Sequence, residues 1–160
     1  MNTILLHKVS APPVDQGLLN QAVGFFNAAS RCFSSVAITP RIDSSPMAAG
    51  IVCAAFSVEM YLKLLAVLGS GKYSHSHKLA ELYAELPAET RTKLTAKYGS
   101  ADVEKHIGEV SAAFVEWRYE HEHGSLNINP SILIRLAKAC HALARELKPE
   151  LRVFGENATV

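Results

Sequence analysis

Apolar residues recur three and four positions apart over long lengths of this chain, and this spacing restricts the fold more than any other feature. The clearest stripe is Met47, Ile51, Ala55, Val58, Leu62 and Leu65. Such steps place side chains on one face of an α-helix, whereas a half-buried β-strand needs alternation with a period of two. No segment sustains that alternation, so the sequence predicts an all-α fold.

Turn residues divide the chain into helical lengths. Ser45 before Pro46, and Asn129 before Pro130, are typical of an N-cap followed by the first helical residue. The predicted helices cover residues 14–37, 46–68, 77–86 with Ser76 as cap, 88–98, Ser100 or Asp102 to Gly124, and 130–147. Four of them are long and amphipathic. The sequence therefore predicts an antiparallel bundle of four long helices with one or two short helices beside them.

Length and composition indicate one domain over residues 1–160, with a core of about 14–148 and a loosely attached tail at 149–160. The net charge of +1 provides no broad basic field, so any nucleic-acid contact needs a local patch. The longest apolar segment contains Glu59 and Lys63, which is typical of a buried helix and not of a membrane span. We expect a soluble, cytoplasmic protein without a membrane partner.

Ionisable side chains gather in the segment WRYEHEHG, residues 117–124, at the end of the fourth predicted helix. Arg118 borders the apolar seam that Trp117 and His121 continue. An arginine in this position costs free energy if it is left unpaired. Either a carboxylate, from Glu122 or Glu59, neutralises it, or it is kept for an anionic ligand.

Two histidines are candidates to act with Arg118. On a regular helix His123 would point about 140° away from it. Gly124 favours unwinding of the last turn, which would bring His123 toward the arginine. His121, three residues after Arg118, already lies on the same side of the helix. Both alternatives stay open on the sequence.

The order of these parts resembles the HEPN superfamily (higher eukaryote and prokaryote nucleotide-binding domains), whose members are helical bundles and in many cases metal-independent ribonucleases. The family signature is an arginine, four to six residues and then a histidine at a helix end, and Arg118, His123 and Gly124 match it. A second recurrent segment is similar to residues 54–86, with Glu59, the pair Lys63 and Leu64, His77 after a loop, and then Leu79 and Leu82. The resemblance covers residues 50–148.

The resemblance implies a reaction that needs no metal or other cofactor. A histidine would take the proton of a ribose 2′-hydroxyl, whose oxygen attacks the adjacent phosphodiester and leaves a 2′,3′-cyclic phosphate. Arg118 would hold the phosphate bidentately. Tyr119 would stack on a base or donate a hydrogen bond. Glu59 would orient Arg118, or would only pair with Lys63 four residues on.

The same resemblance implies a homodimer with its two motifs facing one cleft, an RNA or nucleotide ligand, and an antitoxin-like protein partner in a bacterial defence or toxin–antitoxin setting. Two alternatives remain, so enzymatic activity stays open. One is a non-catalytic module that binds a nucleotide or a protein through Arg118, and the other is a purely structural helical subunit. No metal site is predicted, because histidines two apart on a regular helix point about 200° away from each other.

Overall fold

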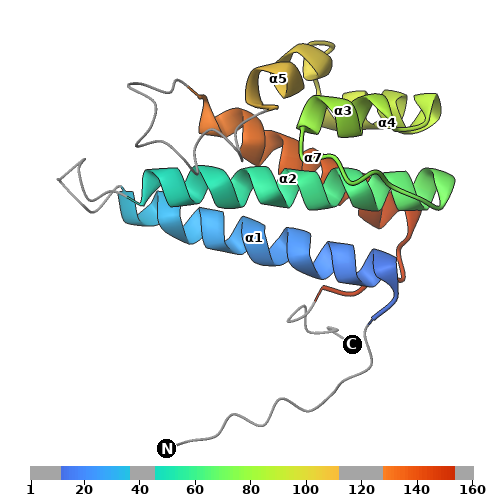
Figure 1. Cartoon of the computed structure of the whole chain (residues 1–160), viewed down its shortest axis with the longest axis horizontal. Helices are drawn as coiled ribbons and strands as arrows, with labels where there is room; N and C mark the ends of the chain where they lie inside the picture. Colours follow the sequence, from blue (N-terminus) through green and yellow to red (C-terminus); the bar gives the residue numbers. More distant parts are fainter. Residues whose placement is uncertain (1–11, 37–45, 112–127, 154–160) are drawn as a thin grey trace, which may run out of the picture.

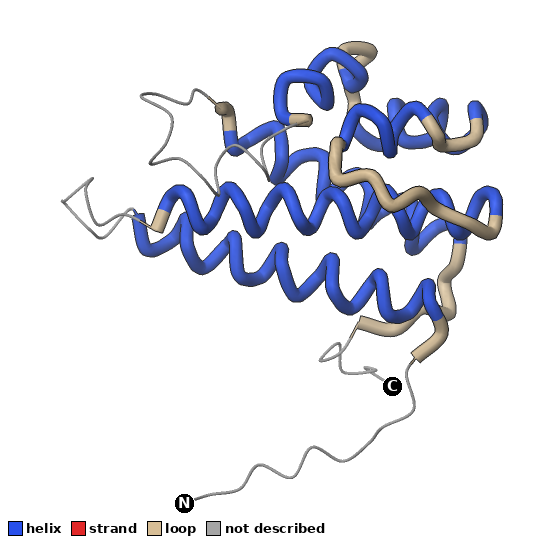
Figure 2. The backbone as a smooth tube through the Cα atoms, viewed as in Figure 1, coloured by secondary structure: helices blue, strands red, loops and turns tan. Residues whose placement is uncertain are grey.

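A computed structural model describes residues 12–36, 46–111 and 128–153, and every regular element in these ranges is an α-helix (Figures 1 and 2). The all-α prediction is confirmed for this part of the chain. The helices are α1 (Val14–Val36), α2 (Met47–Ser70), α3 (Leu79–Ala84), α4 (Ala88–Tyr98), α5 (Val103–Val110) and α7 (Pro130–Leu147).

Helix α2 lies at the centre of the structure. Helix α1 runs antiparallel along one side of it, while α7 and the short helices α3 to α5 lie on the other side (Figure 1). Every residue of α2 from Ser57 to Ala66 is buried. The sequence predicted one apolar stripe on this helix, but neighbours cover it all round along this length. Polar side chains in the segment are therefore buried as well.

Helix α2 is also long and apolar enough to cross a membrane by length and composition, and no other helix in the described ranges passes that test. In its most apolar window, 72% is buried inside the structure. Helices α1, α7 and α3 pack against α2 and account for this composition, because a helix covered on several sides needs apolar side chains on all of them.

Helix α7 begins and packs as its sequence predicts. The Asn129 side chain accepts a hydrogen bond from Ser131 N at 3.0 Å, and Pro130 occupies the first helical position, where its missing N–H costs nothing. Its predicted apolar stripe is buried at Leu133, Leu136, Cys140 and Leu143. These positions face α2 and α4, the helices on which α7 packs most extensively.

Several predicted boundaries differ from those of the structure, and two of them lie next to Ser111. Helix α3 begins at Leu79 and not at residue 77, because Leu79 N and Ala80 N donate to the carbonyl oxygen and Oγ of Ser111, at 3.3 and 2.9 Å. Ser111 is also the residue that follows α5, which ends at Val110 and not at Gly124. The remainder of the fourth predicted helix, residues 112–124, lies outside the described residues.

The start of the predicted tail is packed against the helices. Leu151 is 3% exposed, and its carbonyl oxygen accepts a hydrogen bond from Arg145 Nη1. The backbone of Arg152 exchanges two hydrogen bonds with the Gln16 side chain, at 2.6 and 3.1 Å. Residues 149–153 thus hold the end of α7 on the start of α1, which differs from the expectation of a loose attachment.

An ion pair at the same end of the molecule predicts a pH-dependent contribution to stability. Lys148 Nζ donates to Asp15 Oδ2, and this bond holds the pKa of Asp15 below its ordinary value. A lowered pKa stabilises the folded state above the unfolded-state pKa, and the contribution disappears as the pH falls through the folded-state pKa. In thermal melts, Asp15→Asn should lower the Tm by about 1–3 °C at pH 7. Below both pKa values the two proteins should melt alike.

Glu109→Gln is the control for that experiment, because Glu109 is exposed and no ion pair in the described structure involves it. A Tm difference between Asp15→Asn and wild type that is the same at every pH would contradict the proposed linkage.

Candidate functional site

The structure describes one of the six predicted site residues, Glu59. The other five lie outside the described residues, and they are Arg118, Tyr119, His121, Glu122 and His123. The geometry of the candidate site is therefore the geometry around Glu59.

Glu59 lies on α2 with its side chain fully buried. Its Oε1 accepts a hydrogen bond from Lys63 Nζ at 2.7 Å and lies 3.0 Å from His77 Nδ1. An ionised carboxylate only accepts hydrogen bonds, so the bond to His77 requires a proton on Nδ1. Two donors from different parts of the chain therefore meet at one carboxylate oxygen.

The local sequence explains how both donors reach Glu59. Lys63 follows it by one helical turn, which places the two side chains on the same face of α2. His77 arrives by a reversal of the chain: Gly71 ends α2 with a φ of +78°, a left-handed conformation that favours glycine, and its N–H donates to Val67 O. The following segment returns along α2 toward α3 (Figure 1), so a residue 18 positions later contacts Glu59.

The Glu59 cluster, defined as Glu59, Lys63 and His77, extends from the interior to the surface. The Glu59 side chain is 0% exposed, that of Lys63 is 7% exposed and that of His77 is 58% exposed. The Lys63 ammonium also lies 5.7 Å from the centroid of the Tyr73 ring, within the range of a cation–π contact. The buried charges thus have close partners, and the imidazole connects them to solvent.

The second oxygen of Glu59 differs from the first. Oε2 is buried and has no hydrogen-bond partner among the described residues. A carboxylate oxygen accepts about two hydrogen bonds, and leaving a buried acceptor unpaired costs about 1–3 kcal/mol. Oε2 is therefore the atom of the Glu59 cluster with capacity for one more donor.

Of the two roles predicted for Glu59, the ion pair with Lys63 is present. This pair is buried. An exposed ion pair at the same spacing contributes only about 0.3–0.5 kcal/mol to stability, so that value does not apply to it. Orientation of Arg118 by Glu59 stays a prediction. The sequence predicted His77 at the start of a helix, whereas in the structure it precedes α3 and contacts Glu59. The one sequence feature that could have indicated the contact of His77 with Glu59 is that both residues belong to the segment that resembles the HEPN family.

The described cysteines and histidines provide no metal centre. No group of three or more His, Cys, Asp or Glu side chains in residues 12–36, 46–111 and 128–153 is placed to hold an ion. Cys32, Cys53 and Cys140 are all free thiols. Burial raises the pKa of Cys140 to about 12, so this thiol is uncharged at neutral pH and is a poor nucleophile.

No protein-family model, no curated protein and no solved structure matches this chain. The described structure defines its class from geometry alone: an all-helical protein whose central helix carries a buried carboxylate paired with a lysine and a histidine.

Proposed function

We propose that this chain is an HEPN-like homodimer that binds RNA and cleaves it without a metal ion, in a bacterial defence or toxin–antitoxin setting. Arg118 and His123 are the proposed catalytic residues. The proposal rests on the sequence motif together with one structural observation, the convergence of the Glu59 cluster.

That convergence supports the proposal because its members are residues that carry the resemblance. Glu59, Lys63 and His77 were singled out as an acidic residue, a lysine and a histidine beyond a loop. In the fold they meet at one carboxylate oxygen, with Nζ and Nδ1 at 2.7 and 3.0 Å. The spacing of four residues on α2 accounts for the contact of Lys63 with Glu59, so the contact of His77, 18 positions after Glu59, is the part of the convergence that supports the proposal.

The unpartnered oxygen connects this cluster with the proposed catalytic motif. A guanidinium has five N–H donors and no acceptor, which suits a buried carboxylate oxygen that needs one donor. We assign this role to Arg118, whose remaining donors would bind the scissile phosphate. In the same proposal, residues 112–124 complete an antiparallel HEPN-like bundle, and the antiparallel packing of α1 on α2 is compatible with it.

The proposed reaction is an internal transesterification. His123, with His121 as the competing candidate, accepts the proton of the ribose 2′-hydroxyl, and the 2′-oxygen attacks phosphorus. The bond from phosphorus to the 5′-oxygen breaks, and this oxygen takes up a proton. Arg118 stabilises the charge that develops on the phosphoryl oxygens. Tyr119 contacts a base, and Glu122 lies within ion-pair reach of the arginine on a helix.

Cleavage of RNA in the presence of EDTA tests this function. Arg118→Ala and His123→Ala should each lower the cleavage rate at least about 100-fold, because each removes a group that acts on the transition state. The Tm of His123→Ala should stay close to wild type, whereas Arg118→Ala also removes the proposed donor to Glu59 Oε2 and should melt at a lower temperature. Products should carry 2′,3′-cyclic phosphate ends. His121→Ala identifies which histidine acts.

Arg152→Ala and His75→Ala are the matched controls, since the hydrogen bonds of Arg152 in the described structure are made by its backbone and His75 lies outside the proposed motif. Equal cleavage by wild type, Arg118→Ala and His123→Ala would reject the ribonuclease function. A nucleotide-induced rise in Tm that Arg118→Ala abolishes, without cleavage, would indicate a binding module instead.

A further inference from the structure

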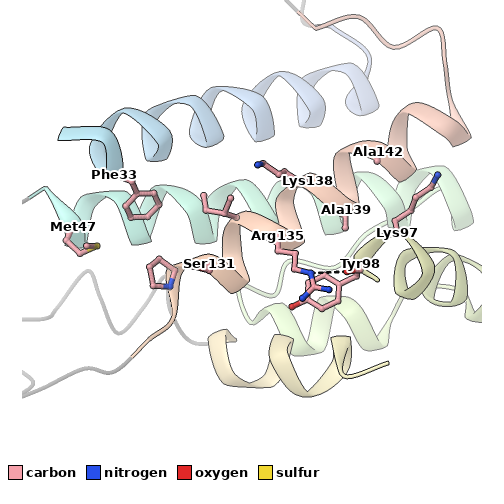
Figure 3. A pocket seen from close by; sticks show the side chains of 11 residues that line it. Phe33, Met47, Lys97, Tyr98, Ser131, Arg135, Lys138, Ala139 and Ala142 are labelled. Atoms are coloured by element: carbon pink, nitrogen blue, oxygen red, sulfur yellow. Dashed lines mark hydrogen bonds between the residues drawn. The ribbon is translucent and has the colours of Figure 1, made fainter. Parts of the chain in front are cut away.

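A second feature of the molecule is an open cavity of about 770 Å³ along α7 (Figure 3). The end of α4 and the residues Phe33 of α1 and Met47 of α2 complete its wall. Among the described residues, its lining includes none of the three members of the Glu59 cluster. Its volume lies in the range of sites that bind small organic molecules, about 300–1,000 Å³.

One face of α7 forms the floor of this cavity. Ser131, Arg135, Lys138 and Ala142 follow one another at steps of four, three and four, so they lie along one side of the helix. The buried stripe of α7 packs on α2 and α4 and leaves these four residues exposed. The cavity is thus a face of α7 that the other described helices do not cover.

The described lining combines apolar and positively charged side chains and contains no acidic residue. Lys97 is paired with Glu146 at 2.6 Å. Arg135 and Lys138 have no carboxylate partner in the described parts of the chain, although both line the cavity. Among the described residues, these two cations are therefore the ones available to an anion in the cavity.

Contacts with Tyr98 hold the Arg135 guanidinium in place. Its Nε donates to Tyr98 O at 2.9 Å, and its carbon lies 4.3 Å from the centroid of the Tyr98 ring. This ring is itself held, since it is buried and its hydroxyl bonds to His106 Nδ1 at 2.8 Å. The two contacts restrict the guanidinium plane and leave the terminal Nη groups available as paired donors. A preoriented arginine of this kind suits a carboxylate, phosphate or sulfonate group.

We infer that this cavity binds a small organic anion with an apolar body. The acidic group interacts with Arg135 and Lys138, and the aromatic or aliphatic body packs against Phe33, Met47 and Ile134. Figure 3 shows Phe33 and Met47 toward one end of the cavity and Tyr98 toward the other, with Arg135 between them. This binding site is independent of RNA cleavage, because it uses different residues.

A pair of fluorescent probes tests both halves of the inference. The anionic probe is 8-anilinonaphthalene-1-sulfonate, and its neutral analogue is N-phenyl-1-naphthylamine. In titrations of the full chain well below its Tm, Arg135→Ala combined with Lys138→Ala should weaken binding of the sulfonate at least about 10-fold, since charge-assisted hydrogen bonds are lost. Binding of the neutral probe should change less than about 2-fold. Lys93→Ala is the control, because Lys93 pairs with Glu89 outside the cavity.

Two further variants separate binding from folding. Lys138→Glu reverses an exposed charge for which the described structure shows no hydrogen bond or ion pair, and it should weaken the sulfonate alone. Ala142→Trp keeps every charge and fills part of the cavity, so it should weaken both probes. Displacement of the sulfonate by decanoate or 1-naphthyl phosphate, but not by decanol or 1-naphthol, supports the ligand class. Sulfonate binding that is unchanged in Lys138→Glu and Ala142→Trp overturns the inference.

Discussion

Lys63→Met is expected to lower the free energy of unfolding by about 3–5 kcal/mol, which corresponds to a Tm decrease of about 6–20 °C for a chain of this length. Methionine preserves the length of the side chain, so the packing of α2 against its neighbours changes little. The Glu59 carboxylate, however, remains fully buried with one oxygen already unpartnered and with His77 as its remaining donor in the described structure. A buried charge that loses its ion-pair partner accounts for the size of the effect.

The matched control for Lys63 is Lys93→Met. Lys93 also pairs with a glutamate four residues earlier, at the same 2.7 Å, but both side chains of that pair are substantially exposed. Solvent screens such a pair, so this variant should melt within about 1 °C of wild type. The double variant Glu59→Leu with Lys63→Met should recover most of the lost stability, because it removes both buried charges together. A Lys63→Met protein that melts like the control would contradict the account of the Glu59 cluster.

Gly50→Leu should lower the free energy of unfolding by about 1–3 kcal/mol through overpacking between α1 and α2. A Cβ atom at Gly50 would lie 2.7 Å from Phe33 Cε1 and 3.0 Å from Cys32 Cβ, closer than side-chain atoms approach each other. The Phe33 ring can rotate away, but Cys32 Cβ is fixed to the backbone of α1. The helices must therefore separate where they pack together, and denaturant unfolding would measure the loss.

Gly24→Ala is the opposite case and serves as its control. Gly24 lies inside α1, and a Cβ atom there meets nothing within 4 Å. Alanine should therefore stabilise the chain by about 0.5–1 kcal/mol, since it lowers the entropy cost of helix formation without a clash. A Gly50→Leu protein that unfolds at the same denaturant concentration as wild type, or at a higher one, would refute the close approach of α1 and α2 at Gly50.

Helices with local start and stop signals were predictable from the sequence. Pro130 after the cap Asn129 begins α7, and Gly99 ends α4 with a φ of +73°. The start of α3 was not predictable, because its first two N–H groups, of Leu79 and Ala80, bond to Ser111, more than 30 positions away in the chain. Periodicity within a segment carries no information about such contacts.

The candidate sites divide in the same way. The spacing of Glu59 and Lys63 predicts an ion pair, but it does not show whether that pair is exposed or buried. The cavity on α7 was missed, because Arg135 and Lys138 look in the sequence like the solvated face of any amphipathic helix. The proposed role of Arg135 depends on Tyr98, a residue of α4 that lies 37 positions earlier in the chain and contacts the Arg135 guanidinium.

Local spacing in the sequence by itself determined that this protein is helical, where several of its helices begin and end, and that Glu59 can reach Lys63. These properties depend on side chains within one or two turns of each other. Only the tertiary structure decided that α2 is enclosed, that His77 joins Glu59, and that one face of α7 stays open beside Tyr98. Burial and long-range contacts depend on which helices pack together. The free energy of that packing depends on contacts between segments far apart in the sequence, so no single segment determines it.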